Sequence, residues 1–339
     1  MNLMFNVSST SVLLWKLYVI KFLNTLYYIC SGKSLILHYP VSVFTVYKYY
    51  HSMEDQLVSN KDGQFLLDLD KVIAGKNPRL PKILPKFLLK YLKTVIHQDD
   101  LNGILIRHRD RYDLDFLDAV LKEFGVKIVY HGIENIPVTG HWIVAANHPL
   151  GGLDGMALMW VLGKVRKDIV FPVNDLLMNI PNLKGLFVPI NKHGSNAGNA
   201  RLIDNAFASD KALLFFPAGL CSRKQQGEIF DLEWKKSFIS KAKGHQRDII
   251  PCHINGRNSN WFYNLARLRS LFGIKANIEM LYLVDEMYKQ RDKEIIISFG
   301  KPISYTIFDK KNSDAAWAQK LKTHVYNLGN DINSTFNAD

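Results

Sequence analysis

Residues 142–155 read WIVAANHPLGGLDG, and the order of residue types in this stretch is typical of an α/β protein. The continuous apolar run Trp142–Ala146 predicts a strand that is buried on both faces. It is followed by a loop that carries His148, two glycines and Asp154, and then by a helix predicted over Gly155–Val165. In α/β sheets the chemistry lies just beyond the carboxyl ends of the strands, which is where this loop would lie.

Short apolar runs and helical stretches alternate over the rest of the chain from about residue 125. This alternation predicts an α/β fold with a largely parallel, mixed sheet flanked by helices, preceded by an N-terminal amphipathic helical segment. The other predicted strands are Val126–Tyr130, Ile169–Val173, Leu186–Ile190, Leu213–Phe216, Ile249–Ile254, Ile278–Leu283 and Ile295–Phe299. The other predicted helices of this part are Ala197–Ala208, Lys235–Ala242 and a closing helix, Asp314–Tyr326.

Four regions are predicted along the 339 residues. Residues 53–120 form a helical, membrane-facing segment, residues 121–310 the α/β domain, and residues 311–339 a C-terminal helix with a polar tail. Residues 1–52 are rich in aromatic and aliphatic side chains, but lysines interrupt them, so no membrane-spanning helix is expected there. They are either an interfacial anchor or an extension read from an earlier start codon, and the polar stretch after Met53 slightly favours the extension.

The segment 85–97, PKFLLKYLKTVIH, predicts an amphipathic helix with Pro85 in its first turn. On a helical wheel its three lysines fall within about 60° of one another, opposite a broad apolar arc. Such a helix either lies in a bilayer interface, with its lysines among anionic phosphates, or packs on a protein core with its lysines in solvent. The membrane-facing residues of the first interpretation are Lys86, Phe87, Lys90, Tyr91 and Lys93.

The composition restricts the partners and the redox environment of the protein. The formal net charge of +12 favours anionic partners such as lipid head groups or an acidic carrier protein. Basic residues are scattered and no nucleic-acid-binding motif is present, so nucleic acid is not an expected partner. The three cysteines form no Cys-x-x-Cys pair, which argues against a disulfide framework and against a metal site and favours a reducing compartment.

Two further loops that follow apolar strands carry basic residues. Lys192 follows the strand predicted over Leu186–Ile190, and Arg223 and Lys224 follow the strand predicted over Leu213–Phe216. Cationic side chains at such positions can hold a phosphate or a carboxylate. Taken singly, each feature has a simpler interpretation: the basic residues are solvated, the histidine of the first loop is a turn residue, and its aspartate is a helix cap.

Taken together and in this order, the loops resemble the lysophospholipid and glycerol-3-phosphate acyltransferase family over roughly residues 120–305. That family carries an Asn-His…Asp block, a strand ending in a basic residue, a Phe-Pro-Glu-Gly block with nearby Ser and Arg, and a Pro-containing strand. The matching residues are Asn147-His148 with Asp154, Pro189-Ile190-Asn191-Lys192, Phe216-Pro217-Ala218-Gly219 with Ser222-Arg223, and Ile249-Ile250-Pro251.

The resemblance implies that His148 acts as general base on the hydroxyl of a lysolipid-type acceptor while Asp154 orients it. The alkoxide would attack an acyl thioester directly, so Cys221 is interpreted as a packing residue rather than a nucleophile. The implied substrate-binding residues are Asn147, Lys192, Gly219, Ser222 and Arg223.

The resemblance further implies membrane lipid biosynthesis without a metal or a bound cofactor, with acyl-CoA or acylated acyl carrier protein as co-substrate. The protein would work on the cytoplasmic face of a membrane that contains anionic lipids, attached peripherally or by an interfacial anchor. The competing class is a non-catalytic, basic, peripheral lipid-binding protein, which would not need the pair of His148 and Asp154.

Two departures from the family pattern affect these expectations. Five residues rather than four separate His148 from Asp154, and we expect the glycine pair at 151–152 to absorb the extra residue. Ala218 replaces the usual glutamate of the third block. This second departure concerns the acceptor more than the reaction, and an amino-acid lipid or another lysolipid becomes an alternative to lysophosphatidate.

Overall fold

A computed structural model of the chain describes residues 58–59, 65–76, 78, 82, 84–173, 177–189, 196–274 and 277–338. Within them, seven strands form one sheet in the order β3-β11-β10-β4-β7-β5-β6. Strands β10, β4, β7, β5 and β6 run parallel to one another, β11 is antiparallel to β10, and β3 is parallel to β11. This confirms the predicted α/β fold with a largely parallel, mixed sheet.

The described strands and helices have the following bounds. The strands are β1 Val58–Ser59, β2 Phe65–Leu66, β3 Lys127–His131, β4 Trp142–Ala146, β5 Ile169–Val173, β6 Phe187–Pro189, β7 Ala212–Phe215, β8 Arg223–Gln225, β9 Glu228–Phe230, β10 Asp248–Asn255 and β11 Glu294–Phe299. The α-helices are α2 Leu69–Lys76, α4 Lys86–Val95, α5 Gln98–Arg107, α6 Asp113–Glu123, α7 Gly152–Leu162, α8 Asn196–Ala208, α9 Ser237–Gly244, α10 Asn260–Leu271, α11 Leu283–Tyr288 and α12 Asp314–Leu328.

One predicted strand, Ile278–Leu283, is wrong. The segment forms the 3₁₀ helix η7 (Ile278–Tyr282) and the first residue of α11. Ile278 packs with Leu265 and Ile274, while Leu281 packs with the separate cluster around α4. A helical turn lets these two side chains, three residues apart, make both contacts. A short apolar run in the sequence does not by itself distinguish such a turn from a strand.

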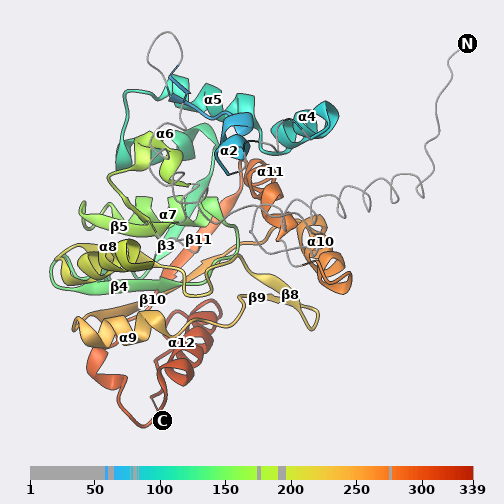
Figure 1. Cartoon of the computed structure of the whole chain (residues 1–339). Helices are drawn as coiled ribbons and strands as arrows, with labels where there is room; N and C mark the ends of the chain where they lie inside the picture. The colour runs from blue at the N-terminus through green and yellow to red at the C-terminus, as the bar shows by residue number, and fades with distance from the viewer. Residues whose placement is uncertain are drawn as a thin grey trace, which may run out of the picture.

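Helices cover both faces of the sheet, and alternate residues of each strand point to opposite faces (Figure 1). In β4, Val144 and Ala146 join the cluster formed with α6 and α7, whereas Ile143 and Ala145 join the cluster formed with α8, α9 and α12. All five residues of β4 are buried, as expected for a strand covered on both sides.

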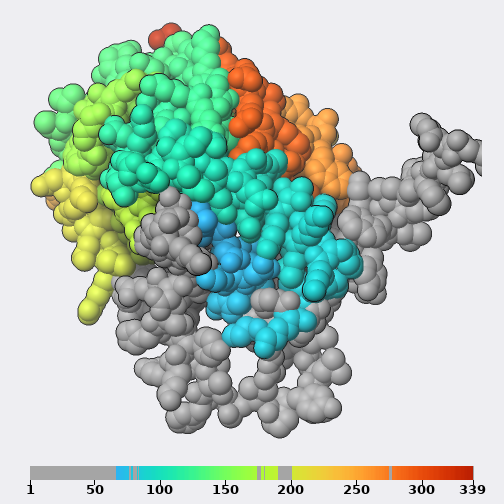
Figure 2. All heavy atoms as spheres, turned by 90° about the horizontal axis from the view of Figure 1, so that it is seen from above, coloured from blue at the N-terminus to red at the C-terminus, as the bar shows by residue number. Residues whose placement is uncertain are grey.

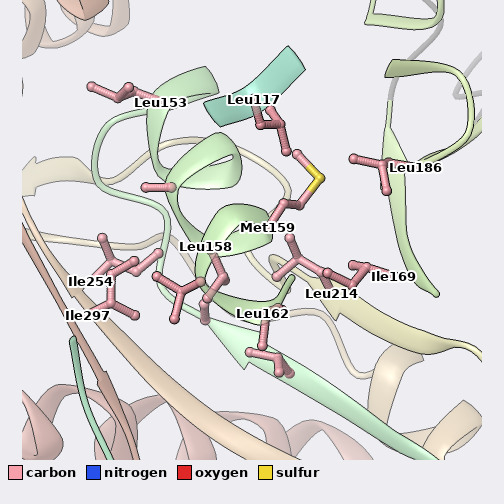
Figure 3. Packing of buried hydrophobic residues seen from close by; sticks show 14 of the residues in the cluster. Leu117, Leu153, Leu158, Met159, Leu162, Ile169, Leu186, Leu214, Ile254 and Ile297 are labelled. Atoms are coloured by element: carbon pink, nitrogen blue, oxygen red, sulfur yellow. The ribbon is translucent and has the colours of Figure 1, made fainter. Parts of the chain in front are cut away.

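Helix α7 fills the centre of the first cluster (Figure 3). Leu158, Met159 and Leu162 are at most 1 % exposed and contact a shell contributed by α6, β5, β7, β10 and β11. A helix that is apolar on all sides is stable only when it is enclosed in this way. Burial of each such side chain contributes about 1.5–3 kcal/mol, so the helix that begins at the histidine loop is held rigidly.

Helices α2, α4, α5 and α6 form a layer above the sheet, which Figure 2 shows from above with α2 in blue and α4 in cyan. Leu88 and Leu92 of α4 are buried in a cluster with residues of α2 and with Leu281, so much of the apolar arc of α4 packs on protein. Phe87 is 58 % exposed.

The remaining predicted membrane-facing residues of α4 divide between solvent and protein. Lys86 and Lys90 are exposed. The Tyr91 hydroxyl lies 2.7 Å from that of Tyr282, and Lys93 forms an ion pair with Asp70. Residues 1–52 lie outside the described residues, and no described helix has the length and apolarity needed to cross a bilayer.

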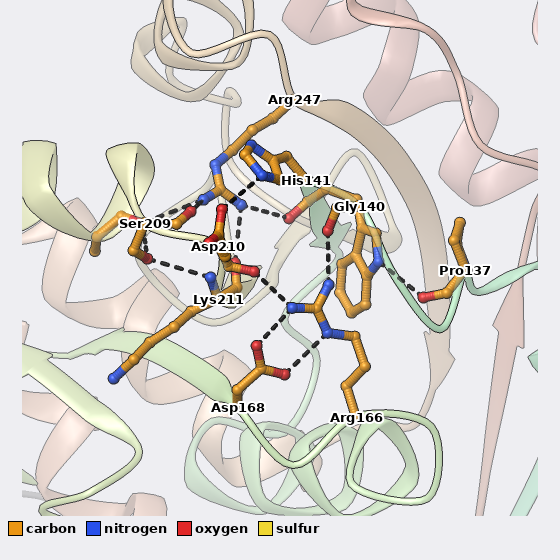
Figure 4. A network of polar contacts seen from close by, with 11 residues as sticks. Pro137, Gly140, His141, Arg166, Asp168, Ser209, Asp210, Lys211 and Arg247 are labelled. Carbon is orange, nitrogen blue, oxygen red and sulfur yellow. Dashed lines mark hydrogen bonds and ion pairs between the residues drawn. The ribbon is translucent and has the colours of Figure 1, made fainter.

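A polar network joins the amino ends of the strands, at the edge opposite to the histidine loop (Figure 4). Arg247, which is fully buried, donates through its guanidinium to the backbone carbonyls of Ala206, Phe207, Ser209, Lys211 and Trp142. A guanidinium has five N–H donors, so these five acceptors use the whole group. Burial, with a smaller effect of Arg166, lowers the pKa of Arg247 to about 10.

We predict that Arg247→Lys lowers the free energy of unfolding by about 2–5 kcal/mol, because a lysine leaves at least two buried carbonyls without a donor. Urea denaturation followed by tryptophan fluorescence measures the change. Arg109→Lys is the control, because the side chain of Arg109 is 59 % exposed and should cost less than about 0.5 kcal/mol. Equal unfolding midpoints for the two variants would contradict this assignment.

Candidate active site

The candidate site lies where β4 and β7 end. The chain leaves β4 at Ala146, forms the loop 147–151 and enters α7 at Gly152. Beyond β7, residues 216–222 lead into the β8–β9 hairpin, and the Ser222 N–H donates to the His148 carbonyl at 2.8 Å. This bond joins the first and third blocks of the sequence motif, which are about 70 residues apart, as parallel strands with a common carboxyl edge would require.

The imidazole of His148 lies against the carboxylate of Asp154, with 3.1 Å between Nδ1 and Oδ2. Asp154 is completely buried and also accepts the N–H groups of Leu150 at 2.8 Å and Gly151 at 3.1 Å through Oδ2, and that of Gly155 at 2.8 Å through Oδ1. Bonds from three main-chain donors hold a carboxylate firmly. The sequence-predicted pair is therefore formed, and its aspartate is immobilised.

Gly151 turns the chain between His148 and Asp154, in the stretch where we expected the glycine pair to absorb the extra residue. Its φ of +87° lies in a region that favours glycine, and a Cβ there would meet Leu283 at 3.0 Å and the Cys221 sulfur at 3.2 Å. The interpretation of Asp154 as a helix cap is confirmed in part: Asp154 is the third residue of α7 rather than the residue before it, and its carboxylate accepts the N–H of Gly151, the residue that precedes the helix. Asp154 thus reaches back to N–H groups in front of the helix.

The surroundings of His148 determine which nitrogen can react. The ring stacks on Phe216 with 4.2 Å between centroids, and the side chain is 17 % exposed. Burial alone would lower the pKa of His148, but the carboxylate of Asp154, with a smaller effect of Asp231, outweighs it and holds the pKa above its ordinary value. With an Nδ1–H donated to Asp154, the neutral ring keeps its lone pair on Nε2, which makes Nε2 the basic atom.

Two predicted substrate-binding residues, Asn147 and Ser222, bond to protein groups. The Asn147 amide pairs with the backbone of Ile254 in β10, at 2.9 Å to the carbonyl and 2.7 Å from the N–H. The Ser222 hydroxyl donates to Asp231 at 2.7 Å. Both side chains are buried, so the contacts that they make in the structure position the loops.

Arg223 lies beside this loop and is also buried. Its guanidinium bonds the Cys221 carbonyl at 2.6 Å and the carboxylate of Glu279 at 2.8 Å. Glu279 also forms an ion pair with Arg269 at 2.9 Å. The three side chains together carry one net positive charge, and the sequence pattern contained no signal for Glu279 or Arg269 as partners.

The other predicted residues are placed as follows. Gly219 adopts a φ of +66° in the turn after β7. Cys221 is completely buried among Phe262 and Tyr263, and burial raises the pKa of its thiol, as suits a packing residue. Lys192 lies outside the described residues. Across the part of the chain that is described, no three His, Cys, Asp or Glu side chains gather into a group that could hold a metal.

Asp231 is a site residue that sequence reasoning missed. Its fully buried carboxylate accepts the main-chain N–H of His148 at 3.1 Å. The residue follows the short strand β9 and belongs to no motif block. The available signal was weak: a single acidic residue between Phe230 and Leu232, in a stretch that otherwise resembles an ordinary hairpin.

The fold and this site define an α/β transferase with a histidine–aspartate pair at the carboxyl edge of its sheet. The sequence profile of a family described as acyltransferase matches residues 71–335, and the chain belongs to that family; the protein is an acyltransferase. It is 47 % identical over 269 residues to a lyso-glycine lipid O-acyltransferase of Bacteroides thetaiotaomicron, a match that covers 79 % of this chain and 99 % of that protein.

Two further similarities extend the comparison. A lyso-glycine lipid O-acyltransferase of Phocaeicola vulgatus is 46 % identical over 79 % of this chain and 96 % of its own length. The crystal structure of the 1-acyl-sn-glycerophosphate acyltransferase PlsC from Thermotoga maritima matches 72 % of this chain and 97 % of its own, with a TM-score of 0.39 and 17 % identity.

We predict that Asp154→Asn lowers the pKa of His148, because the opposing effect of burial remains when the carboxylate charge is removed. Titration of the imidazole resonances by NMR measures the change. Asp168→Asn is the control, since Asp168 pairs with Arg166 at the opposite edge of the sheet. A His148 pKa that is the same in Asp154→Asn and in the wild type would contradict the assigned ion pair.

Proposed function

We propose that the protein transfers a fatty acyl group from an acyl thioester to the hydroxyl group of a lysolipid acceptor, with His148 as general base. The observation that carries the proposal is the contact between His148 Nδ1 and the buried Asp154 carboxylate, which leaves Nε2 as the basic atom of a partly exposed ring. Membership of an acyltransferase family supports the reaction type.

The proposed reaction needs one proton transfer in each direction. Nε2 of His148 takes the proton of the acceptor hydroxyl while the hydroxyl oxygen attacks the thioester carbonyl carbon. The tetrahedral intermediate then collapses, the C–S bond breaks, and the leaving thiolate takes up the proton from the imidazolium. Asp154 keeps the ring in one tautomer and stabilises its charged form throughout. A general base placed in this way contributes about 10²–10⁴-fold to the rate.

We propose a lyso-glycine lipid as the acceptor. The names of the two bacterial relatives support this choice. The net positive charge of Arg223, Glu279 and Arg269 suits an acceptor that ends in a carboxylate. Lys192 would add a second cation, and Gly219 would let the main chain approach the ligand. Asn147 and Ser222 would act by holding the loops in place.

The acyl donor and the membrane complete the proposal. Coenzyme A and acyl carrier protein are both anionic, as is the cytoplasmic face of many membranes, and the net charge of +12 suits all three. A long acyl chain must leave water, so contact with a bilayer shortens its path to the site. The exposed Phe87, between the exposed Lys86 and Lys90, is the part of α4 that would enter the interface.

We predict that His148→Ala lowers the rate of acyl transfer to a lyso-glycine lipid by about 10²–10⁴-fold. Mass spectrometry of the diacylated product, formed from either acyl-CoA or acylated carrier protein, measures the rate. His141→Ala is the matched control, because His141 pairs with Asp210 at the opposite edge of the sheet and its side chain is 47 % exposed.

Two results would count against parts of this mechanism. Transfer by His148→Ala at the wild-type rate would remove the base from the proposal. A wild-type protein that binds lipid vesicles but transfers no acyl group from either donor would favour the competing class, a non-catalytic peripheral lipid-binding protein.

We predict that Phe87→Glu weakens binding to vesicles that contain anionic lipid, because it replaces an apolar side chain at the interface by a negative charge. Co-flotation with vesicles of phosphatidylcholine and phosphatidylglycerol measures the bound fraction. Val138→Glu is the control, since Val138 is 70 % exposed and lies among the loops at the other edge of the sheet. Equal flotation of both variants would mean that α4 is not the membrane contact.

A further inference from the structure

We infer that Asp231 is a positioning residue for acyl transfer: its buried carboxylate fixes the main chain of His148 and supplies a second negative charge beside the imidazole. The inference rests on the proposed role of His148 as base. Asp231 touches neither substrate nor reacting atoms, and it acts through His148 and the loop that carries it.

The carboxylate bonds three donors from three different parts of the site. Oδ1 accepts the His148 N–H at 3.1 Å and the Ser222 hydroxyl at 2.7 Å. Oδ2 accepts Nε1 of Trp234 at 2.9 Å. Since the Ser222 N–H also bonds the His148 carbonyl at 2.8 Å, both main-chain polar groups of His148 are occupied. The histidine is thus joined to Ser222 directly and also through Asp231.

The C-terminal helix supports Asp231 from the other side. The Tyr326 hydroxyl lies 2.7 Å from the Asp231 main-chain nitrogen, and Nζ of Lys322 donates to the Asp231 carbonyl at 2.6 Å. Trp234, whose indole bonds the carboxylate, is itself packed in the cluster under α9 and α12. The position of the histidine loop therefore depends on a helix about 170 residues further along the chain.

The cost of burying this group argues for a role beyond packing. Burial raises the pKa of Asp231, while the bonds from Ser222, Trp234 and the His148 main chain oppose that rise. Among the described residues, no lysine or arginine forms an ion pair with its carboxylate, because Lys322 bonds the main chain instead. A buried carboxylate without a cationic partner costs several kcal/mol, and a neutral residue could fill the same space.

A negative charge at this position favours the state that His148 passes through during the reaction. Asp154 and Asp231 both raise the pKa of His148, and Arg223 lowers it. Buried Cys221, in the segment between β7 and β8, is a further titratable group near Asp154 and Asp231. Tyr326, Lys322 and Glu233 are the titratable groups around Asp231 on its outer side. When His148 takes a proton, the imidazolium that forms is stabilised from two directions.

The test is Asp231→Asn, assayed for acyl transfer over a range of pH. We expect kcat to fall about 10- to 100-fold with KM for the acceptor changed less than about threefold, because the base is misplaced while the acceptor contacts remain. We also expect the acid limb of the kcat–pH profile to move to lower pH, since the loss of a negative charge lowers the pKa of the imidazole.

Two companion variants separate charge from packing. In Asp231→Asn the new amide N–H₂ faces another donor, either Nε1 of Trp234 or the His148 N–H. The double variant Asp231→Asn/Trp234→Phe removes the clash with Trp234. If the double variant recovers wild-type kcat and pH profile, the carboxylate is only a structural acceptor and the inference is overturned. Tyr326→Phe removes the support of the Asp231 main chain and keeps the carboxylate, so its pH profile should match the wild type.

A protein that fails to fold as Asp231→Asn still leaves the inference testable through Ser222→Ala, which removes one donor from the carboxylate. We expect a several-fold lower kcat there, with the pH profile of the wild type because the carboxylate remains, and an unchanged kcat would overturn the inference. Failure of this inference can be distinguished from failure of the proposed function. If His148→Ala is inactive while Asp231→Asn behaves as wild type, only the role of Asp231 is disproved.

Discussion

The candidate active site depends on the contact between the imidazole of His148 and the carboxylate of Asp154. Asp154 can reach the ring only because Gly151 turns the chain with a φ of +87°, which lets α7 begin at Gly152. Leu150 and Gly151 then present N–H groups to the same carboxylate. Both oxygens of the Asp154 carboxylate therefore accept hydrogen bonds from the protein itself. The geometry of the histidine–aspartate pair is set by the main chain before any substrate binds.

Buried polar groups have different roles at the two edges of the sheet. At the amino edge, all five N–H groups of the Arg247 guanidinium donate to backbone carbonyls. These bonds join the strand ends, and no N–H group is left to bind a ligand. At the carboxyl edge, Asn147 bonds the histidine loop to β10, Asp231 bonds the main chain of His148, and the ring itself stays partly exposed. Rigidity is thus supplied by neighbours of the histidine, which leaves Nε2 available.

Much of the fold could be predicted because buried parallel strands leave a strong local signal. The predicted bounds of β4 and β5 agree with the structure, and those of β3, β7, β10 and β11 differ from it by at most one residue at each end. The strand predicted over Ile278–Leu283 failed because a short apolar run also fits a helical turn between two clusters. His148 and Asp154 are six residues apart and share a local motif. Asp231 and Glu279 reach the site through tertiary packing, which no spacing in the sequence encodes.

The third block shows how a change in one residue is linked to distant parts of the fold. Ala218 is buried in the cluster that contains Trp234 and Phe238, where a glutamate would place a charge among apolar side chains at a cost of several kcal/mol. The carboxylate that pairs with Arg223 belongs to Glu279, 56 residues further on, and is shared with Arg269. Sharing leaves one positive charge unneutralised beside the histidine loop. A guanidinium that Glu279 already orients needs no carboxylate at position 218, so the alanine is compatible with the observed geometry.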